Sequence, residues 1–470
     1  MKQKRKLYIA IGCAIMAIVL VISAFMLMKA PGAADVTYPT ITDAVEAYEL
    51  AIQTHKAQDS MCATISYVKE TTIDGQVFRE NGQQQLEYQN IGSDAFCAAI
   101  TETLTTGTHT VEITETYLDE QCFFTVAGVP FQSQLTQEEY LARFTPLVMI
   151  DPSLYSSVTG IQRNGETILS FKNPKAAEAW AIPEACVLQQ AEGSVYLTSD
   201  GQLAKSIYTI SYNTSQANVK YSVSVQLQSG SSQTIAKPAN AKNYTSISYM
   251  DAPRMLEIAS GHLMDCGNIQ ASYSEQIHCQ VFGDLRITDI TLKTDHTDGW
   301  FAQVDTVVSM ENTGKSGASS KKQQTEIFQD GTYRALIDGT ESSEIQEVSK
   351  EAMLSYCRDI LVGSIILPDH IANASVNQTP ETIQIEFDAN DAFADLLKTD
   401  ALNALYQTND ILQDKAYQTE SVVCYLHLDA ETLLPVASGY KLTGNYQVDG
   451  ISYPLIHSTD QSYLLYHIQS

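Results

Sequence analysis

The chain has 470 residues, of which 44% are hydrophobic and 18% are charged, with 24 Gly and 13 Pro. These near-average Gly and Pro contents, together with plentiful aromatic and β-branched residues, exclude a collagenous or disordered protein. The 55 Asp and Glu residues outnumber the 28 Lys and Arg residues and give a formal net charge of −27. This balance argues against a nucleic-acid partner, because phosphate binding needs a basic surface.

The first predicted element is a membrane-spanning helix. Residues 7–28 carry no charged side chain, and this run is long enough to cross a hydrocarbon core of about 30 Å. Basic residues dominate the preceding tail, residues 1–6, which the positive-inside rule places in the cytoplasm. The rest of the chain is then expected outside the cell membrane. The alternative is a cleaved signal peptide with a processing site at the small residues 32–34, which would give a secreted protein.

After a predicted linker at residues 29–38, the two halves of the chain resemble each other in sequence. Four blocks recur in the same order, each with a helix or strand pattern. They are residues 48–51 with 256–259, 63–64 with 271–272, 135–141 with 348–354, and 166–171 with 381–387. In the third pair, Thr136 and Ser349 are predicted N-caps, because acidic residues that suit a helix N-terminus follow each of them. We therefore predict a duplication, and the alternative is a chance likeness between two β-rich segments.

A polar stretch separates the predicted halves. Residues 229–250 are poor in large apolar side chains, which is typical of a linker. The sequence thus predicts a first β-rich domain at 39–228 and a second at 251–470. Because the linker offers little to bury, the two domains are expected to fold separately.

Strand patterns dominate both halves. Apolar and polar residues alternate from Val219 to Leu227 without interruption, as one face of a half-buried strand requires. Asn164-Gly165 and Asp200-Gly201 stand between such runs and predict hairpin turns. Each half is therefore expected to be a large antiparallel sheet with an entry helix and short inserted helices.

A sequence pattern in the second half resembles bacterial envelope proteins related to lipoprotein carriers (LolA-like). The pattern is a strand that ends in Leu-Asp-Ala-Glu-Thr-Leu-Leu-Pro at 428–435, followed by a hairpin partner at 437–442. The resemblance implies a curved antiparallel sheet that forms an incomplete barrel, closed by helices, with acyl chains held on the concave side. The first half departs from this pattern, because residues 198–204 contain no Leu-Pro. The predicted fold class is thus α+β and β-rich: a transmembrane helix followed by two tandem repeats of such a sheet.

Motifs for chemistry are absent or incomplete in the sequence. Eight cysteines lie beyond residue 28, four in each half, and they permit either disulfides or buried thiols. Asp388, Asn390 and Asp391 are similar to a calcium loop, but Phe393 stands where the loop needs Gly, so helix capping is the preferred interpretation. We predict no catalytic residues, no metal site and no cofactor.

The sequence therefore predicts a non-enzymatic, membrane-anchored extracytoplasmic binding protein. Its expected partners are the membrane, through residues 7–28, a lipid or lipoprotein, and other envelope proteins. The candidate ligand-facing residues are one face of the most regular strand: Tyr221, Val223, Val225 and Leu227. One alternative is a structural or adaptor protein of the cell envelope whose helices fill the concave sheets. Another is a hydrolase whose site is dispersed in the sequence.

Overall fold

The computed structural model describes residues 41–465 except for several internal stretches. These are 57–59, 74, 91–92, 108, 143–154, 164–165, 175–185, 215–216, 230–233, 266–268, 280–283, 296–300, 313–318, 342–345, 350–351, 354–355, 357–370, 380, 407–416 and 449. The predicted cytoplasmic tail, membrane helix and following linker, at residues 1–38, lie outside the described part, as does the Asn164-Gly165 turn. None of the described helices has the length and apolar character needed to span a membrane.

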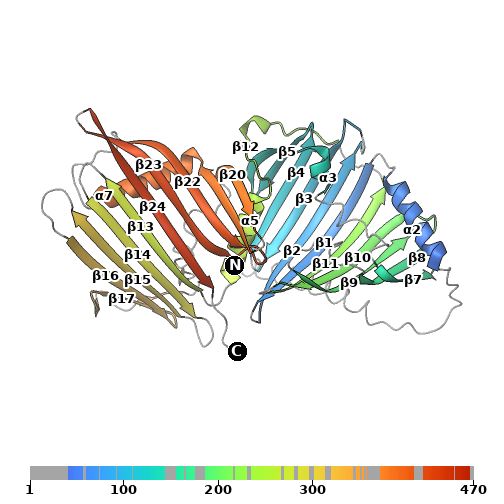
Figure 1. Cartoon of the computed structure of the whole chain (residues 1–470), viewed down its shortest axis with the longest axis horizontal. Coiled ribbons are helices and arrows are strands. Elements are labelled where there is room, and N and C mark those ends of the chain that lie inside the picture. Colours follow the sequence, from blue (N-terminus) through green and yellow to red (C-terminus); the bar gives the residue numbers. More distant parts are fainter. Residues whose placement is uncertain are drawn as a thin grey trace.

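The first half forms one twelve-stranded sheet (Figure 1). Its strands lie in the order β12-β6-β5-β4-β3-β2-β1-β11-β10-β9-β8-β7, and all pairs are antiparallel except β12 with β6. The strands are β1 (Ser60–Ile73), β2 (Gln76–Gln89), β3 (Cys97–Thr106), β4 (His109–Leu118), β5 (Gln121–Val126), β6 (Val129–Gln134), β7 (Tyr155–Arg163), β8 (Glu166–Pro174), β9 (Val187–Leu197), β10 (Leu203–Asn213), β11 (Asn218–Ser229) and β12 (Thr245–Ser246).

The second half forms a second antiparallel sheet. Its order is β18-β17-β16-β15-β14-β13-β24-β23-β22-β21-β20, and β19 also pairs with β17. The strands are β13 (Ile269–Cys279), β14 (Asp284–Asp295), β15 (Phe301–Asn312), β16 (Ser319–Gln329), β17 (Thr332–Ile337), β18 (Thr340–Glu341), β19 (Gln346–Glu347), β20 (Ile371–Gln378), β21 (Thr382–Ala389), β22 (Tyr417–Asp429), β23 (Pro435–Val448) and β24 (Ile451–Leu465).

The two sheets share one strand order. When β12 and β19 are set aside, β6 through β1 and then β11 through β7 correspond one by one to β18 through β13 and then β24 through β20. The block at 166–171 falls on β8 and its partner on β21, which occupy the same place in their sheets. The large antiparallel sheets are confirmed. Both are open, with different strands at their two edges, and neither closes into a barrel.

Helices cover parts of each sheet. The entry helix α2 (Ile41–Lys56) contacts β7, β8 and β10, and α7 (Asp391–Tyr406) contacts β21, β22 and β23. The short helix α3 (Gln137–Ala142) follows β6, and the second entry helix, α5 (Ala252–Asp265), lies at the junction of the two sheets (Figure 1).

The predicted helix starts are confirmed by hydrogen bonds. Thr136 and Glu139 form a capping box, in which the Glu139 amide donates to Thr136 Oγ1 at 3.2 Å and the Thr136 amide donates to Glu139 Oε2 at 2.8 Å. Ser349 Oγ accepts from the Ala352 amide at 3.2 Å. Asn390 Oδ1 accepts from the Phe393 amide at 2.9 Å at the start of α7, so this acidic segment caps a helix as expected.

The stretch between the halves is more embedded than a linker. Thr245 and Ser246 form β12 and pair with β6, while Ile247 and Met250 are buried. The 3₁₀ helix η3 (Ala241–Asn243) precedes this strand, and Ser248 donates a hydrogen bond to the Ala374 carbonyl on β20. The expectation of a stretch that buries little therefore fails for residues 241–250, because apolar and backbone groups of this segment find partners on both sheets.

The alternation predicted at 219–227 is confirmed by burial. Val219, Val223, Val225 and Leu227 are buried in β11, while Lys220 and Gln226 on the other face are exposed. The Asp200-Gly201 turn is also confirmed, because Gly201 has φ +81° between β9 and β10.

Candidate functional site

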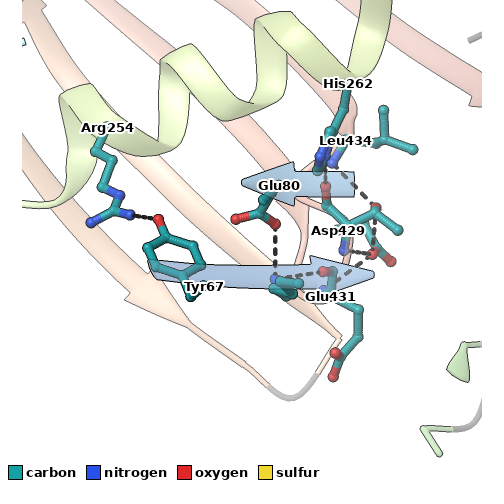
Figure 2. A network of polar contacts seen from close by, with 9 residues as sticks. Tyr67, Glu80, Arg254, His262, Asp429, Glu431 and Leu434 are labelled. Atoms are coloured by element: carbon teal, nitrogen blue, oxygen red, sulfur yellow. Dashed lines mark hydrogen bonds and ion pairs between the residues drawn. The ribbon is translucent and has the colours of Figure 1, made fainter. Parts of the chain in front are cut away.

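A group of buried polar side chains lies where α5 packs on the first sheet. Helix α5 belongs in sequence to the second half, yet it contacts β2, β3 and β4 of the first sheet as well as β20 of its own. The inner face of β1 and β2 carries Tyr67 and Glu80 at this place (Figure 2), and β3 adds the buried Glu102. We call this group the junction network, and its members are Tyr67, Lys69, Glu80, Glu102, His109, Arg254, Glu257 and His262.

Arg254 is the central cation of the junction network. Its Nη2 lies 2.7 Å from Glu102 Oε1 and also donates to the Tyr67 hydroxyl, which in turn donates to Glu102 Oε1 at 2.7 Å. The Glu102 side chain is only 2% exposed, so its charge depends on this partner. Burial lowers the pKa of Arg254, but Tyr67 and Glu102 outweigh it and the pKa is raised. Burial raises the pKa of Tyr67 well above its ordinary value, so its hydroxyl keeps its proton and donates.

A glycine makes room for the Tyr67 ring. Gly82 faces Tyr67 in the register between β1 and β2, and a Cβ at this position would lie 2.0 Å from Tyr67 Cε1. The missing side chain therefore lets the tyrosine lie across β2 toward Glu102 and Arg254.

Lys69 connects the first sheet to the second half. Its Nζ lies 3.2 Å from Glu80 Oε1 and donates to the Glu431 carbonyl at 3.2 Å. Burial raises the pKa of Glu80, but Lys69, with smaller contributions from His262 and Arg254, holds it below its ordinary value of 4.5. Glu80 is therefore an ionised, buried carboxylate in the folded protein.

The middle and the C-terminal part of α5 make further contacts with both halves. Glu257 Oε2 lies 2.6 Å from His109 Nε2 at the start of β4. Gly261 approaches β3 so closely that a Cβ there would lie 1.7 Å from Thr106 Oγ1. The buried His262 ring packs on Phe78 with centroids 5.4 Å apart, and its Nδ1 hydrogen-bonds the Thr432 carbonyl.

Thr432 belongs to the turn between β22 and β23. Asp429 Oδ1 holds this turn by accepting from the Glu431 amide at 3.1 Å, the Thr432 amide at 2.9 Å and the Thr432 hydroxyl at 2.8 Å. Leu433 has φ +55° in the same turn, and Leu434 is buried (Figure 2). The turn thereby presents its carbonyls to Lys69 and His262 across the junction.

The arrangement suits holding two sheets together better than chemistry. The buried carboxylates Glu80 and Glu102 face the cations Lys69 and Arg254, and the two cations form ion pairs with them. Nowhere in the described ranges do three His, Cys, Asp or Glu side chains gather in a way that could hold a metal ion. The thiols of Cys97, Cys186 and Cys424 are free, and burial raises the pKa of each.

The predicted ligand-facing residues lie beside the junction network. The Tyr221 ring packs against the Tyr67 ring in a tilted arrangement, with centroids 5.7 Å apart, and burial raises the pKa of its hydroxyl. Val223 and Val225 are buried between β1 and β10, and Leu227 continues the same face.

Sequence reasoning missed the junction network itself. On the buried face of β2, the polar residues Glu80 and Gln84 lie between the apolar residues Phe78 and Leu86. The sequence of this strand therefore does not predict a buried face. Glu102 pairs with Arg254 of α5, but the two residues are 152 positions apart in the sequence, so no local pattern links them.

Comparisons with known proteins show no family. No protein-family model and no curated protein matches the chain. Among solved structures, LprF from Mycobacterium bovis aligns with 43% of this chain and 100% of its own, at 11% identity and a TM-score of 0.27. OprD from Pseudomonas aeruginosa aligns with 86% of this chain and 95% of its own, at 8% identity and a TM-score of 0.11. A BenF-like porin from Pseudomonas fluorescens covers 86% of this chain and 98% of its own, also at 8% identity and a TM-score of 0.11. At these TM-scores the likenesses carry no conclusion about the fold or function of this chain.

Proposed function

We propose that this chain is a non-enzymatic, membrane-anchored binding protein on the outer side of a cell membrane, and that it works as an adaptor between envelope proteins. The anchor is the uncharged segment at 7–28, with its basic tail in the cytoplasm. Beyond residue 34 the chain is strongly acidic, which suits a soluble extracytoplasmic portion.

The observation that carries the adaptor role is the filled inner face of the first sheet. Val195, Val225, Leu169 and Phe171 on that face have no exposed surface, and α2 and α5 lie across it. A sheet that holds an acyl chain needs an exposed apolar floor, whereas here the chain's own side chains occupy the space. The junction network then fixes α5 and the second half on this packed unit.

A second candidate is the carriage of an apolar or amphiphilic ligand, such as a lipid or lipoprotein. It has support from one observation, which concerns the second sheet. Val308 and Thr306 on the inner side of β15 are partly exposed, although Val304 and Ala302 on the same face are buried. The likeness of residues 428–442 to lipoprotein carriers stays a prediction that points the same way.

Two measurements test the proposal. Membranes from the native host should retain the intact chain, starting at residue 1, after washing at alkaline pH. Release of the protein, or an N-terminus beyond residue 34, would contradict the anchor. Native mass spectrometry of residues 35–470 should then show protein without bound lipid. A stoichiometric lipid would contradict the adaptor role and favour the carrier.

A further inference from the structure

The common strand order allows the docking of α5 to be compared with the same place on the second sheet. Ala63 pairs with Leu86 in the first sheet, and its counterpart Ala271 pairs with Leu292 in the second. When the strand registers are followed outward from this pair, each inner position of β1–β4 corresponds to one of β13–β16. The relation is supported by Glu115 and Glu326, two acids that fall on the same position of β4 and β16.

The positions that α5 covers on the first sheet have counterparts on the second sheet that are at least partly exposed to solvent. Near the sheet centre both copies are buried: Ala98 corresponds to Ala302, and Ile100 to Val304. Toward the α5 end the burial differs. Glu102, Leu104 and Val111 are buried under the junction, whereas their counterparts Thr306 and Val308 are partly exposed and Lys322 is exposed. We call the inner side of β15 and β16 around these three counterparts the open patch.

Helix α2 offers the complementary surface. In the sequence match, Tyr48 and Ala51 correspond to Leu256 and Ala259, and all four are buried. The other side of α5, with Arg254, Glu257, Ile258 and Gly261, faces the first sheet. Its counterparts on α2 are Glu46, Glu49, Leu50 and Gln53, and all four are exposed, with Leu50 at 64%. The face that joins the two halves in α5 is thus unoccupied in α2 within the described part of the chain.

The two open surfaces carry opposite charges. On α2 the counterparts of Arg254 and Glu257 are Glu46 and Glu49, and both are exposed. On the second sheet Lys322 of β16 is exposed at the register position of Val111. Two acidic side chains on the helix therefore complement a lysine on the open patch, and the exposed Leu50 complements the partly exposed Val308.

We propose that a second copy of this chain docks its α2 on the open patch, in the way that α5 docks on the first sheet. The contact joins two different surfaces, so it is heterologous and leaves one free surface at each end of the pair. Chains then associate head to tail along the membrane. Because Gln53 replaces Gly261, α2 lies further from the sheet than α5 does, and the contact is weaker than the internal one. The inference deepens the proposed adaptor role by naming the partner, and it rests on that role.

The test is sedimentation velocity of the full chain in detergent over a range of concentrations. We expect the wild type to form dimers and larger species as the concentration rises, and less so in high salt. Leu50→Asp blocks the helix face and Lys322→Glu blocks the open patch, and each is expected to weaken association by about tenfold or more. Both positions are exposed, so neither change threatens the fold. The matched controls Val77→Asp and Lys220→Glu, exposed on the other face of the first sheet, should associate as the wild type does.

Mixing the two blocked variants gives the decisive result. The Leu50→Asp chain keeps its open patch and the Lys322→Glu chain keeps its helix face, so the mixture should form one-to-one dimers that do not grow. A chain that carries both substitutions should stay monomeric. A monomeric wild type, association that survives both substitutions, or a mixture without dimers would overturn the inference. Bound lipid in native mass spectrometry would separately contradict the adaptor role, whereas retention of the anchor is independent of both results.

Discussion

Five charged residues of the junction network are buried or half-buried, namely Lys69, Glu80, Glu102, Arg254 and Glu257. Burying them is costly unless each charge has a partner. Glu102 and Glu80 lie on adjacent strands, and Arg254 and Lys69 lie within 2.7 Å and 3.2 Å of them. Ion pairs of this kind contribute little net stability compared with apolar packing, but they strongly penalise an arrangement in which one partner is missing. The pairs therefore fix the orientation of α5 on the first sheet more than they strengthen the fold.

Removing the guanidinium should expose that penalty. Arg254→Ala leaves Glu102 buried without its cation, and we expect a loss of about 3–5 kcal/mol in the free energy of unfolding, measured with urea. Lys172→Ala removes an exposed ion pair with Glu192 and is expected to cost at most about 1 kcal/mol. The double change Arg254→Met with Glu102→Leu should recover most of the loss. Equal effects of Arg254→Ala and Lys172→Ala would show that the junction is not desolvated.

The acid side of the stability profile should depend on Glu80. Its pKa is below 4.5 in the folded protein, so folding favours the ionised form. This contribution is complete above the unfolded pKa and is lost as the pH falls through the lower, folded value. We expect Glu80→Gln to be less stable than the wild type at neutral pH, and the difference between their urea midpoints to shrink below pH 4.5. A difference that does not change with pH would contradict the assignment.

Among the elements, α5 is distinguished by having two packed faces. Leu256 and Ala259 are buried as Tyr48 and Ala51 are in α2, but Ile258, Glu257 and Gly261 are also in contact. The close approach at Gly261 is the feature that a substitution can test.

Gly261→Ala should act as a wedge between α5 and β3. Alanine favours a helix over glycine by about 1 kcal/mol, but its Cβ would meet Thr106 Oγ1 at 1.7 Å. We therefore expect a net destabilisation of about 1–3 kcal/mol, measured by thermal unfolding and urea. Thr106→Gly in the same chain should relieve part of it, whereas Ser260→Ala, half-buried on the same helix, should change little. A stabilised Gly261→Ala protein would show that the helix has room to move.

Strand β11 provides the test of a filled core. Val223 is buried between Tyr67 on β1 and Tyr208 on β10. Val223→Ala removes two methyl groups and leaves a void, which should cost about 1–3 kcal/mol in unfolding free energy. If the residue instead lines a ligand groove, the same change should leave stability nearly unchanged and alter ligand retention.

On the scale of the whole molecule, the two sheets are coupled through α5, β12 and the turn at Asp429. Ser248 donates a hydrogen bond to the Ala374 carbonyl, and Lys69 donates one to the Glu431 carbonyl. These two hydrogen bonds connect the first half to the second at two separate places. The polar stretch at 229–250 predicted two domains joined by a flexible linker, whereas in the structure the two halves contact each other directly.

We accordingly expect the extracytoplasmic part to unfold in urea in a single transition. Tyrosine fluorescence and circular dichroism should report the same transition midpoint. Hydrogen exchange should protect α5 as strongly as β3, because the helix opens only when the first sheet does. Arg254→Ala should split the transition or lower the protection of α5 alone. Two separate transitions in the wild type would show that the halves fold independently.

The sequence by itself determined the local elements. The period-two alternation at 219–227, the capping residues Thr136, Ser349 and Asn390, and the turn at Gly201 each depend on neighbours a few residues away, so the pattern contained the answer. The matching blocks in the two halves also predicted two similar sheets, because a repeated pattern predicts repeated elements.

Only the tertiary structure decided the junction. From the sequence alone, the face that carries Glu80, Gln84 and Glu102 would be predicted to be exposed to solvent. It is buried because α5 covers it, and Arg254 of that helix is 152 positions from Glu102 in the sequence. The side of α5 that packs, and the sheet it packs on, depend on the close approach at Gly261 and on the turn that bonds Lys69 and His262. Pairing over such distances follows from how whole sheets fit together, and no local pattern specifies it.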